Sequence, residues 1–324
     1  MKILANDGMH DLGKQMLLDA GYELFINKIP QNALASEIRN YDVLIVRSAT
    51  KVTKEIIDAG VNLKLIGRGG VGLDNIDVTY AEKKGVPVIN TPESSSASVA
   101  ELVFAHLFGM VRNLPESNRK MPNGGTNLFN DLKKKFSNGT ELNGKTLGII
   151  GFGRIGVAVA KIAIGIGMDI KVFDKYSHAT EITIQFPKHI FNEVLKIPVK
   201  IISKEEVLKS SDFITIHTPF EEGNEAIIGK KEIDIMRKGA GIINCSRGGA
   251  VDEKALLEAL NSGKVKYAGI DVYRNEPDPN IELLSHPNVS LTPHCGASTI
   301  ECQERIGLEL ADKIISHFNN LKNK

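Results

Sequence analysis

Three residues suited to binding a small acid and moving a proton follow three short apolar runs in the second half of the chain. Arg247 follows AGIIN, Glu276 follows VKYAGI and His294 follows NVSL. An arginine fork binds a carboxylate through two parallel hydrogen bonds. A histidine titrates near neutrality, and a carboxylate beside it fixes its tautomer and favours its charged form. Together these groups could hold a 2-hydroxy acid by its carboxylate and exchange the proton of its hydroxyl group.

Each of these residues also has an ordinary structural interpretation. A lone arginine at a strand end usually forms a surface ion pair, and Glu276, within RNEPDP, could belong to a plain polar turn. Other histidines are alternatives for proton exchange. His106 lies on an apolar helical face, where we expect it to be packed. His217 lies at a strand end, where Thr218 and Pro219 predict a turn at the cofactor edge, and His286 is a further weak candidate. The presence of all three residue types at consecutive strand ends favours the catalytic interpretation.

A glycine pattern typical of dinucleotide sites precedes this group. Gly151, Gly153 and Gly156 form GxGxxG between the apolar run TLGII and a helical stretch. The first glycine suits a tight turn, the second lets the backbone approach a pyrophosphate, and the third allows close helix packing. Asp174 closes the next apolar run, where it could accept a hydrogen bond from a ribose and repel a 2′-phosphate. We therefore expect NAD rather than NADP, although Lys175 softens that preference; the alternative is a glycine turn without a ligand.

A second glycine cluster, GRGGVG at 67–72, also follows an apolar run. No acid closes the run after it, VPVIN, so it does not fit a dinucleotide site. It could be a tight turn, or a loop whose bare backbone N–H groups suit a carboxylate. Under the second interpretation Gly69, Gly70 and Val71 would contact the substrate.

The elements that must position these residues alternate between short apolar runs and helical stretches. This alternation predicts βαβ units and an α/β fold with two doubly wound parallel sheets. We expect a flavodoxin-like substrate-binding domain made of residues 1–94 and 292–324, to which the last helix, 298–318, returns. We expect a Rossmann NAD-binding domain over 95–291. Residues 115–143 are polar and predict an arm or linker, with Pro115 ending or bending the long helix before it.

Composition narrows the possible functions. The 324 residues suffice for two domains, and the net charge of +1 argues against a nucleic-acid partner or an anionic membrane. No apolar run approaches the roughly 18 residues of a membrane span. The 3 cysteines form no CxxC pair, so we expect no metal site or disulfide framework and a reducing cytoplasmic location.

The longest motifs resemble the D-isomer-specific 2-hydroxyacid dehydrogenases over essentially the whole chain. The matching stretches are VRSATKVT, GRGGVGLDNID, INTPESSSASVAEL, GTELNGKTLGIIGFGRIG, DFITIHTP, INCSRGGAVDEKALLEAL, DVYRNEP and PHCGAST. The resemblance implies that Arg247 binds substrate, Glu276 orients the histidine and His294 is the acid–base. The positions expected at the NAD site are Val71, Gly151, Gly153, Arg154, Ile155, Gly156, Asp174, His217, Thr218, Pro219, Cys245, Ser246, Arg247, Asp271, His294, Gly296 and Ala297.

Within that family the similarity is greatest to the D-3-phosphoglycerate dehydrogenases. The implied activity is NAD-dependent oxidation of D-3-phosphoglycerate to 3-phosphohydroxypyruvate, the first step of serine biosynthesis. Arg47 and Ser48 would then lie near the substrate phosphate, with Lys51 close by, although RSATK could be an ordinary charged turn. A homodimer through the cofactor domain and the arm is also implied.

Three departures from the family bear on this interpretation. The carboxy-terminal regulatory domain of many phosphoglycerate dehydrogenases is expected to be missing. About a dozen extra residues lie between Asp174 and Asp212, which predicts a reshaped adenosine wall or a surface hairpin. Glu93 stands where a small or amide residue is common, and its charge would repel a phosphate. Another D-2-hydroxyacid dehydrogenase, such as a glyoxylate or hydroxypyruvate reductase, is the alternative, followed by an NAD-sensing corepressor-like binding protein.

Overall fold

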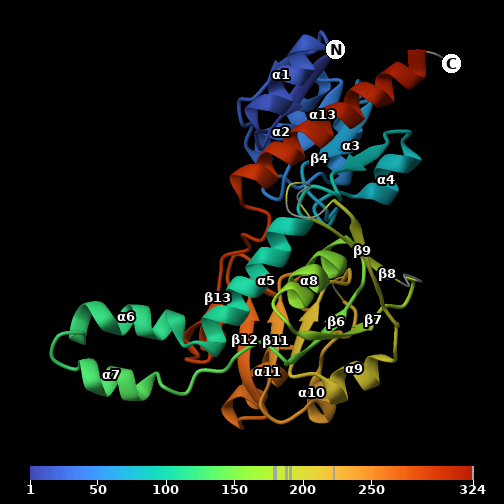
Figure 1. Cartoon of the computed structure of the whole chain (residues 1–324). Coiled ribbons are helices and arrows are strands. Elements are labelled where there is room, and N and C mark those ends of the chain that lie inside the picture. The colour runs from blue at the N-terminus through green and yellow to red at the C-terminus, as the bar shows by residue number, and fades with distance from the viewer. Residues whose placement is uncertain (178–180, 187–188, 190–191, 222, 323–324) are drawn as a thin grey trace. The chain divides into compact units, whose positions relative to one another are not determined.

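The structure is a computed structural model that describes residues 1–177, 181–186, 189, 192–221 and 223–322. The chain forms two compact units, each continuous in space (Figure 1). Unit 1 comprises Met1–Ser98 and Ala297–Lys324, and unit 2 comprises Val99–Gly296. Within the described ranges, no helix combines the length and the apolar character needed to cross a membrane.

Unit 1 is built on a five-stranded parallel sheet in the order β2-β1-β3-β4-β5. This is the flavodoxin-like strand order expected from the sequence. Its strands are β1 (Lys2–Ala5), β2 (Glu23–Phe25), β3 (Val43–Val46), β4 (Leu65–Arg68) and β5 (Val88–Asn90). Its helices are α1 (Asp11–Asp19), α2 (Gln31–Glu37), η1 (Ile38–Asn40), α3 (Lys54–Ala59), α4 (Val78–Lys83) and α13 (Ile300–Lys322).

Helices cover both faces of this sheet. Residues of α2, α3 and α4 share one apolar core with the strands. Helices α1 and α13 share the other, to which Leu310 and Ile314 of the last helix contribute fully buried side chains. The two helices approach closely at Gly13 and Gly307, where a Cβ on Gly13 would lie 2.4 Å from the Gly307 carbonyl oxygen. The last helix is therefore part of the core of unit 1.

Unit 2 contains a six-stranded parallel sheet in the order β13-β12-β11-β10-β6-β7. Its strands are β6 (Thr146–Ile150), β7 (Asp169–Phe173), β10 (Phe213–Ile216), β11 (Ala240–Asn244), β12 (Val265–Ile270) and β13 (Val289–Leu291). Beyond β7, Val172 forms one more parallel bridge, to Ile201. Counting that bridge as a minimal third strand gives the order 3-2-1-4-5-6-7, which is the Rossmann arrangement 3-2-1-4-5-6 extended by β13.

The helices of unit 2 divide between the two faces of its sheet. Helices α5 (Ser96–Val111) and α8 (Arg154–Gly165) contribute to one core. The opposite core contains residues of α9 (Lys204–Ser210), α10 (Lys230–Ile235), α11 (Glu253–Asn261) and α12 (Ile281–Ser285). Both faces are covered, so the central strands are mostly apolar, and β11 is buried at all five positions.

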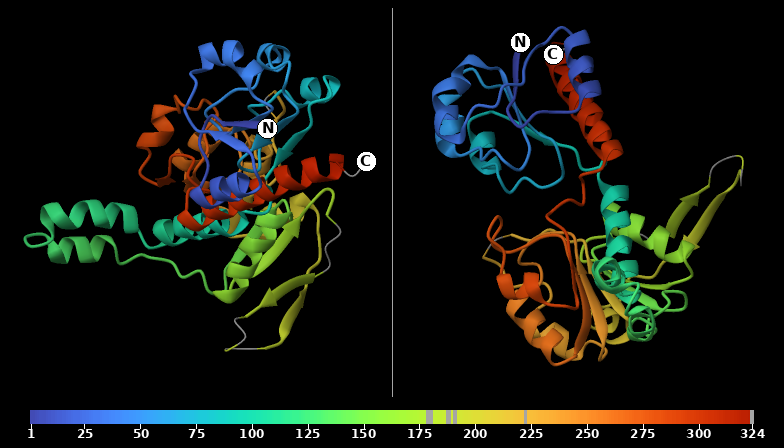
Figure 2. Two further views of the ribbon diagram at one scale, coloured as in Figure 1. Left: turned by 90° about the horizontal axis from the view of Figure 1, so that it is seen from above. Right: turned by 90° about the vertical axis from the view of Figure 1, so that its left-hand side faces the viewer.

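The extra segment between Asp174 and Asp212 contains a two-stranded antiparallel hairpin, visible in Figure 2. Its strands are β8 (Glu181–Gln185) and β9 (Val194–Pro198). Ile182 is fully buried, and Ile184 and Ile197 pack against the core that contains α5 and α8. Of the two possibilities raised by the sequence, the described residues form the hairpin; the rest of the insertion, at 178–180, 187–188 and 190–191, lies outside them.

Residues 115–143 form a helical arm rather than an unstructured linker. Helix α5 ends at Val111, and Pro115 occupies the first turn of α6 (Leu114–Gly124), a position that proline tolerates because its N–H is not needed. Helix α6 and α7 (Phe129–Lys135) run side by side away from the sheet of unit 2 (Figures 1 and 2). Exposed Leu128 and Phe129 lie where the arm turns.

The contact between α1 and α13 predicts that replacing a helical glycine by alanine lowers the stability of the protein, which is the opposite of the usual effect. Glycine to alanine inside a helix normally stabilises by about 1 kcal/mol. Gly13→Ala should instead lower the free energy of unfolding, by about 1–3 kcal/mol, because the new Cβ collides with the backbone of α13. Gly165→Ala, in the last turn of α8 with no atom within 4 Å of its Cβ, is the control and should be neutral or stabilising. Urea unfolding of both variants measures the difference, and stabilisation by Gly13→Ala would contradict this packing.

Candidate active site

The three candidate catalytic residues follow three adjacent strands of unit 2. The last residues of β11, β12 and β13 lie side by side, since Asn244 pairs with Ile270 and Ile270 with Leu291. Parallel strands bring their carboxyl ends to the same edge of a sheet. The loops that begin at this edge carry Arg247, Glu276 and His294, as their sequence positions predict.

His294 and Glu276 form a direct pair. His294 Nδ1 lies 2.7 Å from Glu276 Oε2, while Glu276 Oε1 accepts a hydrogen bond from the backbone N–H of Tyr273 at 2.9 Å. A carboxylate only accepts hydrogen bonds, so Nδ1 carries the proton and Nε2 is left for proton exchange. The His294 and Glu276 side chains are 49% and 37% exposed, so a small molecule can reach the pair.

A buried carboxylate holds the loop that carries His294. Asp271 is 1% exposed, and its Oδ1 accepts from the backbone N–H of Cys295 at 2.8 Å and its Oδ2 from that of Gly296 at 3.0 Å. The Asp271 carbonyl accepts from the His294 N–H at 2.7 Å. His294 itself has a φ of 52°, in the left-handed region that non-glycine residues rarely adopt. Such strain, of order 1–3 kcal/mol, persists only where surrounding contacts impose it.

The loop of Arg247 packs against the loop of Glu276. A Cβ on Gly248 would lie 1.9 Å from the Tyr273 carbonyl oxygen, so only glycine permits this approach. Asn244 closes the turn, because its Nδ2 donates to the Arg247 carbonyl at 2.9 Å and its Oδ1 accepts from Ser246 Oγ at 2.8 Å. Arg247 is half-buried, and its Nη1 donates to the Ser246 carbonyl at 2.8 Å. The structure thus brings the loop of Arg247 against the loop that carries Glu276.

The glycines of GxGxxG occupy three different environments. Gly151 has a φ of 98°, and a Cβ there would lie 2.6 Å from the His217 carbonyl carbon. A Cβ on Gly156 would lie 2.1 Å from the Gly151 oxygen, so this position must also be glycine. Gly153, the N-cap of α8, has no atom within 4 Å of its Cβ position and no side-chain cap. The amino end of α8, where Arg154 and Ile155 begin the helix, is therefore open to an anion such as a pyrophosphate.

Polar atoms without partners lie beside this turn. In the described part of the chain, His217 Nδ1 and Thr218 Oγ1 are buried and accept or donate no hydrogen bond. Burial lowers the pKa of His217 to about 3, so its ring is neutral at physiological pH, and its Nε2 lies 2.9 Å from Thr215 Oγ1. A ring with a pKa near 3 is too weak a base for the acid–base role that the sequence left open for it. Unsatisfied buried groups beside an open helix end fit a bound dinucleotide.

Asp174 closes β7 next to the glycine turn. Its Oδ2 accepts from the Phe152 N–H at 2.6 Å, and its Oδ1 accepts from the N–H groups of Tyr176 and Ser177 at 2.7 and 2.6 Å. The carboxylate thereby joins the glycine turn to the segment after β7. Its position at the end of the second strand is the one from which an acid contacts a ribose in Rossmann domains.

In unit 1, the side chains of Asp7 and Asn75 hold the loop of Arg47 and Ser48. Asp7, with a side chain 4% exposed, accepts from the backbone N–H groups of Arg47 and Thr50 at 2.8 and 3.0 Å. Asn75 Nδ2 donates to the carbonyls of the same two residues. Arg47 is half-buried and Ser48 is exposed. Asp7 and Asn75 were not identified from the sequence. Asp7 lies two residues after the end of β1, and polar residues after strand ends were informative elsewhere in the chain.

The glycine loop of unit 1 follows β4, next to the strand that precedes Arg47. Gly70 has a φ of 139°, and a Cβ there would overlap the Arg68 guanidinium. The Gly69 N–H donates to the Val46 carbonyl at 2.9 Å, and Asn90 Nδ2 donates to the Val71 carbonyl at 2.6 Å. Val71 is 36% exposed. These contacts tie the loop to β3 and β5. Later in the chain, Ala297 is the residue at which unit 1 resumes.

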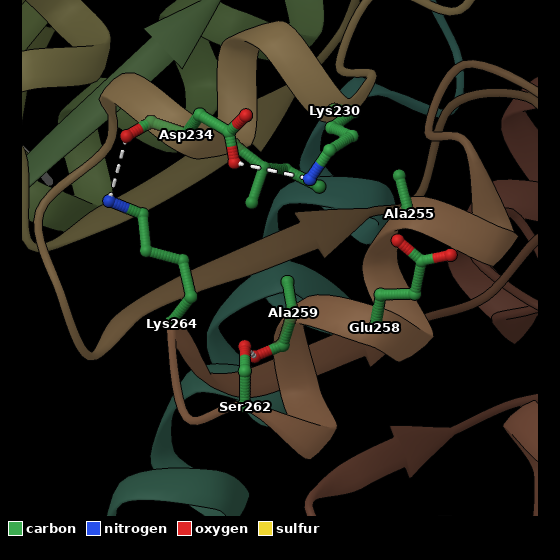
Figure 3. Close-up of a pocket in the computed structure, with 8 residues that line it drawn as sticks. Lys230, Asp234, Ala255, Glu258, Ala259, Ser262 and Lys264 are labelled. Atoms are coloured by element: carbon green, nitrogen blue, oxygen red, sulfur yellow. Dashed lines mark hydrogen bonds and ion pairs between the residues drawn. The ribbon is translucent and has the colours of Figure 1, made fainter.

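A hollow of 230 Å³ in unit 2 lies away from these groups (Figure 3). It is formed by α10, the end of α11 and Lys264, which directly precedes β12, so it lies near the amino ends of the strands. Lys230 pairs with Asp234 at 3.6 Å, and Lys264 Nζ donates to the Asp234 carbonyl at 3.0 Å. Its lysines are thus engaged by α10, and none of its lining residues is a histidine.

The comparisons with known proteins agree with this geometry. Residues 104–296 match the family described as D-isomer specific 2-hydroxyacid dehydrogenase, NAD binding domain. The chain belongs to the D-isomer-specific 2-hydroxyacid dehydrogenases. These proteins are NAD-dependent oxidoreductases, and the matched residues of unit 2 form their NAD-binding domain.

Individual relatives differ in their named substrates. The chain is 41% identical to the D-3-phosphoglycerate dehydrogenase of Methanocaldococcus jannaschii over 97% of its own length, and it spans 57% of that relative. It is also 41% identical to the hydroxypyruvate reductase of Thermotoga maritima, over 98% of both chains. Among solved structures, the NAD⁺-bound 3-phosphoglycerate dehydrogenase of Entamoeba histolytica has a TM-score of 0.76 and 28% identity, covering 99% of this chain and 96% of that one.

The environment of His217 predicts a pH dependence of stability. A histidine has a pKa of about 6.5 when unfolded, whereas folding lowers that of His217 to about 3. The unfolded state therefore binds more protons, so the contribution of His217 to stability is complete above pH 6.5 and is lost as the pH falls toward 3. His217→Gln should make the urea midpoint change less between pH 7.5 and pH 5.

His189→Gln, at an exposed histidine of the same unit, is the control and should keep the wild-type pH dependence. If the pH dependence of the urea midpoint is unchanged in His217→Gln, folding does not lower the pKa of His217.

Proposed function

We propose that the protein catalyses NAD-dependent oxidation of D-3-phosphoglycerate to 3-phosphohydroxypyruvate, the first step of serine biosynthesis. The observation that carries the reaction class is the 2.7 Å contact between His294 Nδ1 and Glu276 Oε2 at the carboxyl edge of the sheet of unit 2. The substrate assignment rests on the similarity to phosphoglycerate dehydrogenases together with Arg47 and Ser48.

In this proposal each catalytic residue has one task. His294 Nε2 takes the proton of the substrate hydroxyl group, because its Nδ1 is committed to Glu276. Glu276 keeps the ring oriented and stabilises the imidazolium that forms. Arg247 binds the substrate carboxylate through its guanidinium fork and polarises the neighbouring carbonyl group of the product. Bound NAD supplies the hydride acceptor.

The chain's own residues also suit the cofactor. Gly153 and the first turn of α8 would hold the pyrophosphate, and Asp174 would contact a ribose and disfavour a 2′-phosphate. His217 and Thr218 have buried polar atoms to offer beside the glycine turn. The other residues proposed to contact NAD are Val71, Gly151, Arg154, Ile155, Gly156, Pro219, Cys245, Ser246, Arg247, Asp271, His294, Gly296 and Ala297.

Arg47 and Ser48 are the proposed ligands of the substrate phosphate, and Gly69, Gly70 and Val71 the proposed backbone contacts. The loop of Arg47 is held at both ends of its turn by Asp7 and Asn75, so the guanidinium starts from a fixed backbone. Such preorganisation reduces the entropy lost when a ligand binds. We further propose a homodimer that uses the apolar tip of the α6–α7 arm.

A second candidate function is reduction of hydroxypyruvate or glyoxylate. It is favoured by the hydroxypyruvate reductase of Thermotoga maritima, which aligns with this chain over 98% of both. The exposed carboxylate of Glu93 in unit 1 also disfavours a phosphorylated ligand. An NAD-sensing binding protein would need no proton-exchanging pair, so the His294–Glu276 contact argues against it.

A substrate panel decides between these functions. With D-3-phosphoglycerate as substrate, kcat/KM measured with NAD should exceed kcat/KM measured with NADP. With NAD as cofactor, kcat/KM for D-3-phosphoglycerate should exceed kcat/KM for unphosphorylated 2-hydroxy acids by at least about tenfold. His294→Asn should lower kcat by about 10²–10⁴, as loss of an acid–base does. Turnover of glyoxylate or hydroxypyruvate with none of 3-phosphoglycerate would reject the proposed substrate. A His294→Asn variant that keeps the wild-type kcat would reject the mechanism.

Arg47→Ala tests the phosphate contact separately. Losing a charge-assisted hydrogen bond costs about 1.5–3 kcal/mol, so kcat/KM for the phosphorylated substrate should fall about 10- to 100-fold. With an unphosphorylated 2-hydroxy acid the change should stay within about threefold. Arg39→Ala, at an exposed arginine of η1, controls for loss of charge on unit 1. Equal losses with both substrates would show that Arg47 does not bind the phosphate.

A further inference from the structure

A buried histidine outside the proposed catalytic set is built into unit 2. His106 of α5 is 2% exposed and packs against β12 and β13 at one edge of the sheet. A Cβ on Gly269, inside β12, would lie 2.8 Å from His106 Cβ, so the strand carries a glycine where the ring enters. Glycine weakens a strand interior and often marks a close approach of this kind. The sheet therefore has a space that fits this imidazole.

Both ring nitrogens of His106 have hydroxyl partners near the end of β13. Nδ1 lies 2.8 Å from Ser290 Oγ, and Nε2 lies 3.0 Å from Thr292 Oγ1. The Thr292 hydroxyl continues the chain, since it donates to Asp271 Oδ1 at 2.6 Å. A continuous line of hydrogen bonds thus joins α5 to the carboxylate that holds the His294 loop.

The direction of this line follows from what each group can donate. The Asp271 carboxylate only accepts, so the single Thr292 hydroxyl proton is used there. Thr292 Oγ1 must then accept from His106 Nε2–H. Burial is the main influence on His106 and lowers its pKa, which keeps the ring neutral, while Asp271 opposes this shift more weakly. The neutral ring has a bare Nδ1, which accepts the Ser290 hydroxyl.

We propose that His106 is a positioning residue for the acid–base His294, acting through Thr292 and Asp271. This proposal rests on the proposed function of His294. The neutral Nε2–H ring holds the Thr292 hydroxyl toward Asp271. The Asp271 carboxylate then faces the backbone N–H groups of Cys295 and Gly296 and keeps His294 in its left-handed conformation. Removing the imidazole frees Thr292 to rotate and loosens this loop.

Nitrogen-15 NMR of the uniformly labelled protein tests this line of hydrogen bonds without a measurement of turnover. Long-range ¹H–¹⁵N correlations should identify His106 as the neutral Nε2–H tautomer at pH 7, with assignment from the missing signals of His106→Leu. In Thr292→Val the ring signals of His294 should shift, and in Thr292→Ser they should stay at the wild-type position. A Nδ1–H or doubly protonated His106, or His294 signals unchanged in Thr292→Val, would overturn the proposal.

Kinetics of matched variants provides the second test. His106→Leu and Thr292→Val should each lower kcat by about tenfold, because displacement of a reacting group by a fraction of an ångström has effects of this order. Substrate KM should stay within about threefold. His106→Gln, whose amide nitrogen can replace Nε2, and Thr292→Ser should keep kcat within about threefold of wild type. The double variant His106→Leu/Thr292→Val should be no slower than the slower single variant, because both break one line.

If the fold-losses in kcat of the two single variants multiply in the double variant, the two residues do not act through one line of hydrogen bonds. A wild-type kcat in both single variants would also contradict the proposal. If His106→Leu does not fold, the Thr292→Val and Thr292→Ser pair carries the same comparison. If the wild-type protein turns over no 2-hydroxy acid, the proposed function fails, and the NMR comparison still decides whether His106 positions His294.

Discussion

The structure of the candidate site depends on the burial of one carboxylate. A charged group removed from water must be met by hydrogen-bond donors, and Asp271 at the end of β12 finds them in Thr292, Cys295 and Gly296. Collecting these donors draws the chain after β13 back over the neighbouring strand. The same fold of the loop puts His294 into a left-handed conformation and beside Glu276. The hydrogen bonds that satisfy Asp271 therefore also set the geometry of the His294–Glu276 pair.

Local pattern predicts most of this architecture. The helical stretch expected after the GxGxxG glycines forms as α8, because apolar periodicity is a local signal. The meeting of Glu276 with His294 was also predictable, since adjacent parallel strands end at one edge. Contacts such as His106 with Ser290, 184 residues apart, leave no local signal. An apolar helical face predicted a packed ring, which is correct, but not its two hydroxyl partners.

Two segments were harder to interpret for a different reason. The arm at 115–143 is rich in Gly and Asn, residues of low helix propensity, yet α6 and α7 form because they pair with each other. The third strand of the Rossmann order is reduced to the bridge between Val172 and Ile201, and the β8–β9 hairpin precedes it. No run of alternating apolar residues marks so short a strand. Where tertiary pairing replaces local preference, sequence periodicity is uninformative.

The order of segments along the chain has a consequence for synthesis. Unit 2 is one continuous stretch, Val99–Gly296, and all of its sheet is translated before α13. Unit 1 lacks one wall of its core until Leu310, Ile314 and Phe318 arrive and cover β1, β3 and β4. Until then Ile3, Ile45 and Leu65 expose apolar surface to water. The amino-terminal unit therefore receives its last core residues after every core residue of unit 2 has been translated.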